Sequence, residues 1–135
     1  MPILPTAPEV PTVKGPDAWF TGDVWFDVVA APPAPSRLRV NAVHFSPGAH
    51  TFWHRHAHGQ TLHVTEGVAR VGTRDGAVVE LRPGQTHWTP PGEWHWHGAA
   101  PTTFMTHLAM WEAGGDSDRP DTEWADEVTD EQYGA

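Results

Sequence analysis

The chain has 135 residues, of which 39% are hydrophobic and 19% charged, which suits one globular domain with a single core. A formal net charge of -9 argues against nucleic acid and anionic membrane surfaces as partners, so we expect a small-molecule substrate. The absence of cysteine excludes disulfides and thiolate metal sites. We find neither a signal-peptide pattern nor the roughly 18 consecutive apolar residues of a membrane helix, and we expect a cytoplasmic protein.

Residues 1–16 are rich in proline and have no periodicity, which predicts an N-terminal arm outside the domain proper. Short alternating segments follow, separated by turn residues such as Asp75-Gly76 and Pro83-Gly84. This pattern predicts an all-β sandwich or barrel over residues 17–113. The expected strands are Asp23–Val29, Arg37–Phe45, Thr51–His56, Thr61–Thr65, Val68–Thr73, Val78–Leu81, Thr86–Thr89, His95–Gly98 and Thr103–Trp111.

The chain after the Gly114-Gly115 break differs in composition. Residues 114–135 carry a run of acidic side chains that is typical of a solvated tail. Within it, Trp124 and Val128 are four residues apart, and this spacing predicts the one helix of the chain over Thr122–Gln132.

Histidines are clustered in two of the expected strands. His54 and His56 are two residues apart, so an extended strand would project both from one face. Gln60 follows after Gly59, and His95 comes from a later hairpin. Three imidazoles and one amide oxygen suit a divalent metal of intermediate softness. The sequence therefore predicts a metal site formed by His54, His56, Gln60 and His95.

The spacing around these residues resembles the cupin superfamily. The first cupin motif matches from Gly48 to Gly67, with Gln60 in place of the usual glutamate, and the second matches from Gly84 to His95, with Ala99 in place of asparagine. The resemblance implies a double-stranded β-barrel of the jelly-roll type, which commonly assembles as a homodimer or homotetramer. It implies the same four metal ligands.

Longer stretches, among them residues 15–22, 54–61, 91–109 and 128–133, resemble a small bacterial group of cupins that includes the manganese-dependent, (R)-selective hydroxynitrile lyases. Manganese is therefore the metal that the resemblance favours, although iron, nickel, zinc and copper also suit this set of ligands. A neutral Gln60 would leave the full charge of the dication on the site, which polarises a bound oxygen more strongly than a glutamate ligand would.

Two further histidines are catalytic candidates, His107 as the general base that takes the substrate hydroxyl proton and His97 as a residue that hydrogen-bonds the substrate or supports the metal ligands. His97 shares a strand face with His95, and His107 lies among Met105, Ala109 and Trp111 on another strand. Apolar neighbours should keep His107 neutral and able to act as a general base. The resemblance also implies an acid–base role for His107.

The expected substrate pocket is formed by residues that point inward on their strands or lie beside the ligands. We expect Asn41, Val43, Trp96, Met105 and Trp111 to line it. Asn41 is polar, and Trp111 bulky, where the resemblance leads us to expect a small apolar residue and a polar one. Trp19 and Phe20 have two interpretations, core packing or capping of the barrel of a neighbouring subunit.

The favoured function is a carbon–carbon lyase that cleaves cyanohydrins to an aldehyde and cyanide. One alternative is a metal-dependent dioxygenase of the quercetinase type, against which Gln60 counts mildly. Another is a non-catalytic cupin that binds a metal or small molecule. An isomerase or decarboxylase acting on a hydroxy or keto acid is less favoured, because Arg55 is the one arginine near the motifs and should point away from the ligands.

Overall fold

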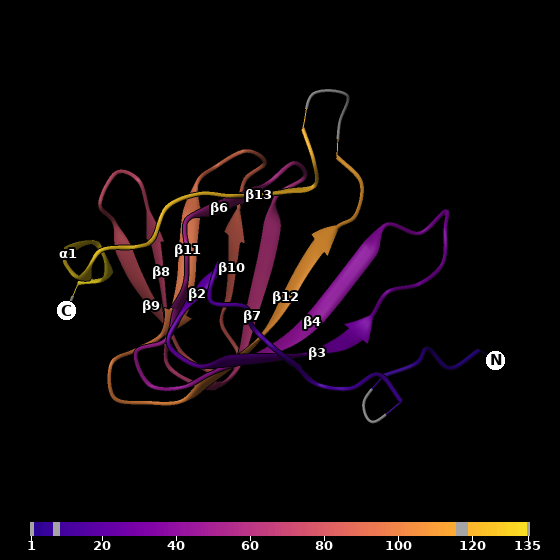
Figure 1. Ribbon diagram of the computed structural model, residues 1–135, viewed down its shortest axis with the longest axis horizontal. Coiled ribbons are helices and arrows are strands. Elements are labelled where there is room, and N and C mark those ends of the chain that lie inside the picture. The colour runs from indigo at the N-terminus through magenta and orange to yellow at the C-terminus, as the bar shows by residue number, and fades with distance from the viewer. Residues whose placement is uncertain (1, 7–8, 116–118, 135) are drawn as a thin grey trace.

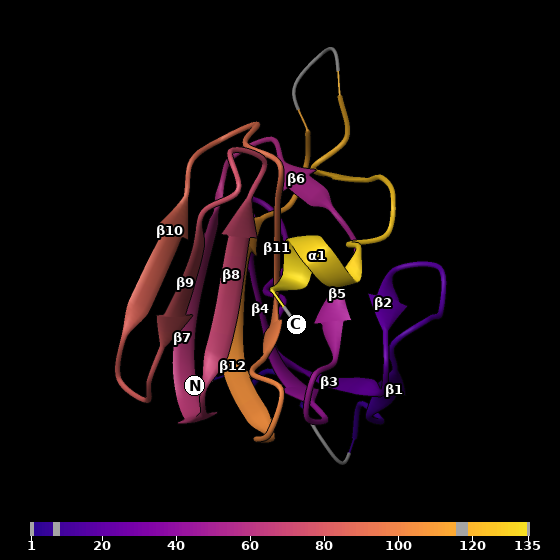
Figure 2. The same ribbon diagram turned by 90° about the vertical axis from the view of Figure 1, so that its left-hand side faces the viewer.

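The computed structural model describes residues 2–6, 9–115 and 119–134, and shows two antiparallel β-sheets that curl around a shared interior (Figure 1, Figure 2). The first sheet has the strand order β1 (Val13–Lys14), β3 (Val24–Ala30), β4 (Leu38–Phe45), β12 (Met105–Glu112), β7 (Gln60–Gly67) and β10 (Thr86–Thr89). The second has the order β13 (Thr122–Trp124), β6 (His54–His56), β11 (His95–Ala99), β5 (His50–Thr51) and β2 (Phe20–Thr21), and β8 (Ala69–Thr73) joins β11 to β9 (Val78–Leu81). This architecture confirms the predicted all-β jelly-roll barrel.

The interior follows from side-chain alternation on the long strands. Residues of β12 are alternately buried and half-buried from Met105 to Met110, and β12 pairs with β4 on one side and β7 on the other. His107 therefore lies opposite Val43 and Val64, in the middle of the first sheet. The apolar core between the two sheets includes Phe45, Leu62, Val64, Val71 and Met105.

The predicted helix over Thr122–Gln132 is wrong for most of its length. Residues Thr122–Trp124 form β13, which pairs with β6, and the helix α1 covers only Asp130–Tyr133. Thr129 begins this helix with a capping box, in which its hydroxyl accepts from the Gln132 N–H. The spacing of Trp124 and Val128 was misleading because Trp124 stacks on His54 whereas Val128 packs in a separate cluster.

The two short strands β1 and β2 were not predicted, because each is formed by pairing with a strand from another part of the chain. Val13–Lys14 pairs with β3, so the end of the proline-rich stretch belongs to the sheet, and Phe20–Thr21 pairs with β5. The expected strand Thr51–His56 is interrupted, because the N–H groups of Phe52 and Trp53 donate to Trp19 and Asp126 rather than to a neighbouring strand.

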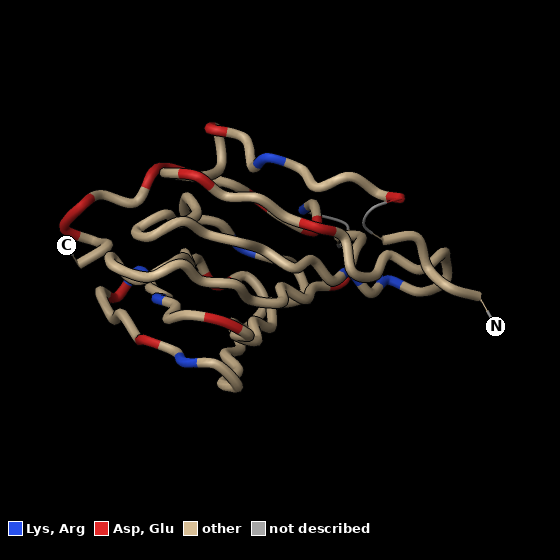
Figure 3. Tube along the Cα trace, turned by 90° about the horizontal axis from the view of Figure 1, so that it is seen from below, with Lys and Arg blue, Asp and Glu red and all other residues tan. Residues whose placement is uncertain are grey.

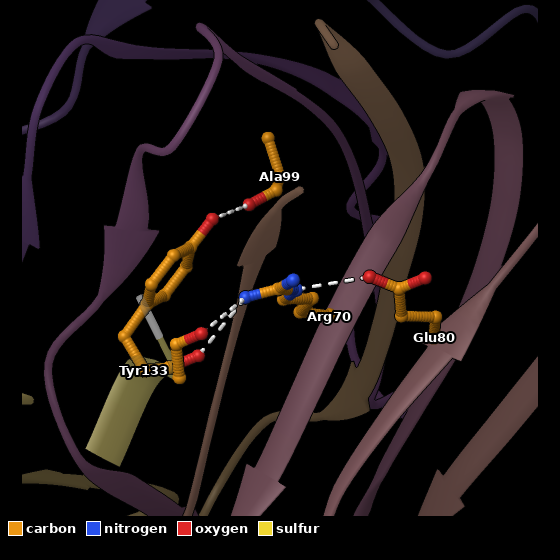
Figure 4. A network of polar contacts seen from close by, with 5 residues as sticks. Arg70, Glu80, Ala99 and Tyr133 are labelled. Carbon is orange, nitrogen blue, oxygen red and sulfur yellow. Dashed lines mark hydrogen bonds and ion pairs between the residues drawn. The ribbon is translucent and has the colours of Figure 1, made fainter. Parts of the chain in front are cut away.

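The C-terminal segment packs against the outside of the second sheet. The Tyr133 hydroxyl donates to Ala99 O at 2.6 Å, and Arg70 donates to the carbonyl oxygens of Tyr133 and Gly134 while it pairs with Glu80 (Figure 4). Tyr133 is buried in a cluster with Trp53, Trp96 and Val128. The segment up to Gly134 is thus part of the folded domain.

The acidic residues of this segment are partly engaged in ion pairs. Glu123 pairs with Arg55 and Asp126 with Arg74. Figure 3 shows acidic positions along the stretch that leads to the C-terminus. Asp116 and Asp118 of the expected solvated tail lie outside the described residues. No helix among the described residues is long and apolar enough to cross a membrane.

Candidate metal centre and cavity

The four predicted metal ligands lie together between the two sheets. His54 and His56 come from β6, His95 from the neighbouring β11, where it is the direct partner of His54, and Gln60 from β7 in the facing sheet. The ring centroids of His54 and His95 are 4.3 Å apart, and those of His54 and His56 are 5.2 Å apart. Gln60 Oε1 is 2.8 Å from His95 Nε2.

The outward nitrogens of the three histidines have partners that fix the rings. The Nδ1 atoms of His54 and His95 lie 3.0 and 3.2 Å from the carbonyl oxygens of Phe52 and Glu93, so each carries a hydrogen and donates. His56 Nδ1 lies 3.0 Å from the Thr122 hydroxyl. A neutral imidazole with a hydrogen on Nδ1 has its lone pair on Nε2, so these contacts turn lone pairs toward the shared centre.

Burial keeps these histidines neutral. It lowers the pKa of His54 to about 4, and burial together with the charge of His54 lowers the pKa of His56 to about 3. The pKa of His95 lies well below its ordinary value, for the same reasons. Metal ligation requires unprotonated imidazole, and this environment supplies it near neutral pH.

A divalent cation fits this donor set. His56 Nε2 is buried and has no hydrogen-bond partner among the described residues. His95 Nε2 and Gln60 Oε1 both present lone pairs to one another at 2.8 Å, an arrangement that a cation between them would relieve. Buried acceptors without a donor are costly unless such a partner is supplied.

His97 also belongs to this cluster. One ring nitrogen from each of His54, His95 and His97 lies within 4.8 Å of the other two, so this triad is a second possible ligand set. However, His97 Nδ1 is 2.8 Å from His107 Nε2, whereas His56 Nε2 has no protein partner. The contacts of His56 therefore favour the set with His54, His56, Gln60 and His95.

The two candidate catalytic residues have different positions. His97 lines the cavity, whereas His107 is fully buried behind it and does not contact the cavity. Burial lowers the pKa of His107 to about 4 and that of His97 well below its ordinary value, with the charge of His107 contributing to the shift of His97. The expected base His107 therefore has no contact with the cavity, whereas His97 lines it.

A cavity of about 470 Å³ opens beside the histidines, between the two sheets. Of the expected pocket residues, Asn41, Val43 and Trp111 line it. Trp96 and Met105 do not, because Trp96 points from β11 into the cluster around Tyr133 and Met105 is packed in the core of the first sheet. The lining consists of Trp19, Phe20, Phe26, Arg39, Asn41, Val43, Thr51, His54, His56, Gln60, His97, Ala109, Trp111, Ala113, Asp121, Thr122 and Trp124.

Several of these residues were missed in the sequence. Trp19 stacks on Trp124 with ring centroids 5.0 Å apart, and Trp124 stacks on His54 with ring centroids 4.6 Å apart. Two distant segments therefore form one aromatic wall of the cavity. Neither interpretation of Trp19, core packing or capping of another subunit, anticipated this. Arg39 could have been found by alternation, since it is two residues before Asn41 on the same strand.

The barrel and its histidine cluster define the class of protein. The cupin domain model matches residues 41–111, and the chain belongs to the cupin family. It is 50% identical over 120 residues, 89% of each chain, to a protein of Granulicella tundricola named (R)-mandelonitrile lyase. These matches confirm the resemblance to mandelonitrile-lyase-like cupins.

Solved structures give the same fold. A cupin-like protein from Thermotoga maritima has a TM-score of 0.80 and 35% identity, and covers 89% of both chains. A cupin 2 conserved barrel domain protein from Rhodopseudomonas palustris has a TM-score of 0.69 over 91% of this chain and 80% of its own. At 18% identity, the latter supports the fold alone.

Proposed function

We propose that this protein is a metal-dependent lyase that cleaves cyanohydrins of aromatic aldehydes to the aldehyde and hydrogen cyanide. The observation that carries the proposal is His97, a neutral imidazole that faces the cavity beside the donor set. The 50% identity to a protein named (R)-mandelonitrile lyase supports this reaction class.

His54, His56, Gln60 and His95 would hold the metal, a set that suits several divalent cations. Among these we propose manganese, because the chain resembles the manganese-dependent hydroxynitrile lyases. A divalent cation bound there would supply Lewis-acid stabilisation of negative charge on the substrate hydroxyl oxygen. Thr122, Phe52 and Glu93 orient the ligand imidazoles through their Nδ1 contacts.

His97 acts as the general base in this proposal. Its Nδ1 faces His107 Nε2 at 2.8 Å, so Nε2 is the nitrogen available to the cavity. Donation from His97 Nδ1–H to His107 would place the lone pair of His97 on Nε2, where it accepts the hydroxyl proton of the cyanohydrin. The carbon–carbon bond then breaks, the aldehyde forms, and His97 returns the proton to the departing cyanide.

The aromatic lining of the cavity would bind the ring of the substrate. Trp19, Phe26, Trp111 and Trp124 supply large apolar surfaces that favour stacked or edge-on aromatic contacts. A volume of about 470 Å³ is within the usual range for small-molecule sites.

The test is benzaldehyde release from racemic mandelonitrile by manganese-loaded protein, at a pH low enough to suppress spontaneous decay. We expect metal-dependent release from one enantiomer, and a decrease of about 100-fold or more in kcat for His97→Ala with the metal retained. The matched control is His63→Ala, because His63 lies on the outer surface and is hydrogen-bonded to Thr86. An absence of release by protein with confirmed metal content would refute the proposal, and oxygen uptake in the same screen would point to a dioxygenase.

A further inference from the structure

Arg39 is a charged residue in an otherwise largely apolar and aromatic part of the cavity. It lies on β4 two residues before Asn41, and both side chains line the cavity on the same face of the strand. The one acidic residue of the lining, Asp121, accepts the Gly114 N–H at 3.1 Å.

The guanidinium of Arg39 has unused hydrogen-bonding capacity. Its Nη1 donates to Leu38 O at 2.7 Å and Pro32 O at 3.4 Å, which hold the group at the cavity wall. In the described part of the chain Arg39 forms no ion pair, whereas Arg55, Arg70 and Arg74 each pair with a carboxylate. The donors on Nε and Nη2 of Arg39 remain for a ligand.

Asn41 adds a second polar group. Its side-chain amide makes no hydrogen bond to another residue that the structure describes, and it lies between Arg39 and Val43 on the cavity face of β4. A guanidinium beside an amide NH₂ provides the planar, multiple donors that recognise a carboxylate.

The strand register sets the distance between this pair and the reaction centre. Val43 pairs with His107, Asn41 with Ala109 and Arg39 with Trp111, so Arg39 is four residues from the level of His107. At about 3.3 Å per residue this separation is roughly 13 Å along the strand. On the other side of β12, Met110 pairs with Thr61, so the proposed ligand Gln60 lies near the level of Arg39 but two strands away, roughly 10 Å at about 4.8 Å per strand. A group bound by Arg39 would therefore be at the opposite end of the substrate from a hydroxyl carbon held beside the metal ligands and His97.

We propose that Arg39 and Asn41 form an anion subsite, and that the substrate carries a carboxylate on the end of its aromatic ring opposite the reacting carbon. This inference rests on the proposed function, of which it specifies the substrate class. A local cation is needed to bind such a substrate because the chain as a whole has a net charge of -9 and repels anions.

The experiment compares two probes of similar shape and different charge, 4-(hydroxymethyl)benzoate and 4-(hydroxymethyl)benzamide. Binding of each to manganese-loaded protein is measured by isothermal titration calorimetry, which needs no turnover. The variants are Arg39→Gln, which removes the charge and keeps a hydrogen-bonding side chain, and Arg39→Lys, which keeps the charge. Arg82→Ala, at an exposed turn, is the control.

We expect wild-type protein and Arg82→Ala to bind the benzoate about tenfold more tightly than the benzamide, as a charge-assisted hydrogen bond provides. Arg39→Gln should bind both probes about equally, with its affinity for the benzamide unchanged, and Arg39→Lys should keep part of the preference. Equal binding by wild-type protein, an undiminished preference in Arg39→Gln, or no binding of either probe at millimolar concentration would overturn the inference.

The two proposals fail separately. Cleavage of mandelonitrile without a preference for the benzoate would overturn the anion subsite and leave the lyase in place. A preference for the benzoate that depends on Arg39, without cleavage of any cyanohydrin, would support the subsite and refute the lyase.

Discussion

The two faces of β11 are equally buried and chemically opposite. All five residues from His95 to Ala99 are buried. His95 and His97 face the interior between the sheets, where they meet other imidazoles, whereas Trp96 faces outward into an apolar cluster with Trp53, Val128 and Tyr133. One strand thus separates a polar site from a hydrophobic cluster.

The two faces differ in what surrounds their buried polar atoms. On the outer face, the Tyr133 hydroxyl and the Trp53 indole N–H have acceptors, and His50 Nε2, which has no partner among the described residues, belongs to a ring packed against Trp96 and Tyr133. On the inner face, His56 Nε2 and His107 Nδ1 are buried without partners among the described residues, and His56 lines the cavity. Because an unpartnered buried nitrogen is costly and the inner face adjoins the cavity, the inner face is the one suited to bind a ligand.

The largest expected effect is on the outer face. Tyr133→Ala would remove a buried aromatic ring and the hydrogen bond to Ala99 O, and should lower the free energy of unfolding by about 3–5 kcal/mol. Tyr133→Phe removes only the hydroxyl and should cost about 1 kcal/mol. Urea unfolding gives both values. A loss of manganese affinity in folded Tyr133→Phe would show that the two faces are not independent.

On the inner face, His56→Ala and His97→Ala distinguish the two possible ligand sets. We expect His56→Ala to lower manganese affinity by more than about 100-fold, since even the residues that orient ligands contribute about 10–100-fold. His97→Ala should lower it by less than about 10-fold. Competition with a chelating dye measures both. The reverse order would assign the metal to His54, His95 and His97 instead.

The variant Thr122→Val tests the hydrogen bond to the proposed ligand His56, because valine keeps the shape of the threonine side chain and removes its hydroxyl. The Thr122 hydroxyl is 3.0 Å from His56 Nδ1, and its loss should weaken manganese binding by about tenfold. Thr86→Val is a matched control, because Thr86 contacts His63 on the outer surface. Unchanged affinity in Thr122→Val would mean that β13 does not contribute to the metal site.

Acid should destabilise the metal-free protein because the buried histidines of the inner face resist protonation. In the folded state burial lowers the pKa of His54 and His107 to about 4 and that of His56 to about 3, whereas unfolded histidine titrates near 6.5. Below pH 6.5 the unfolded chain binds protons that the folded protein does not, so stability falls as pH falls from 6.5 toward 4.

The expected loss is about 1 kcal/mol per histidine between pH 7 and pH 5.5. Urea unfolding of chelator-treated protein across this range measures it. A free energy of unfolding that stayed constant would show that these imidazoles are not neutral and buried in the metal-free state.

Much of the fold was predictable from local patterns. The strands that became β3, β4, β9, β10 and β12 were placed within about two residues, because their alternation and bounding turns are encoded locally. Gly72 illustrates what is less visible, since a Cβ there would come 2.1 Å from Trp96 Nε1 and so only glycine allows the tryptophan to pack. Such close approach depends on a partner strand that the local sequence does not identify.

The sequence by itself determined the barrel class, the predicted ligands His54, His56, Gln60 and His95, and the pair His97 and His107. Their spacing is tied to strand alternation and to turn glycines, which act over a few residues. The tertiary structure decided which histidine faces the cavity, that Trp19 and Trp124 form its wall, that Trp96 does not, and that the C-terminal segment supplies Thr122. These outcomes depend on pairing between segments far apart in the chain, such as β13 with β6, which is set by packing of the whole domain.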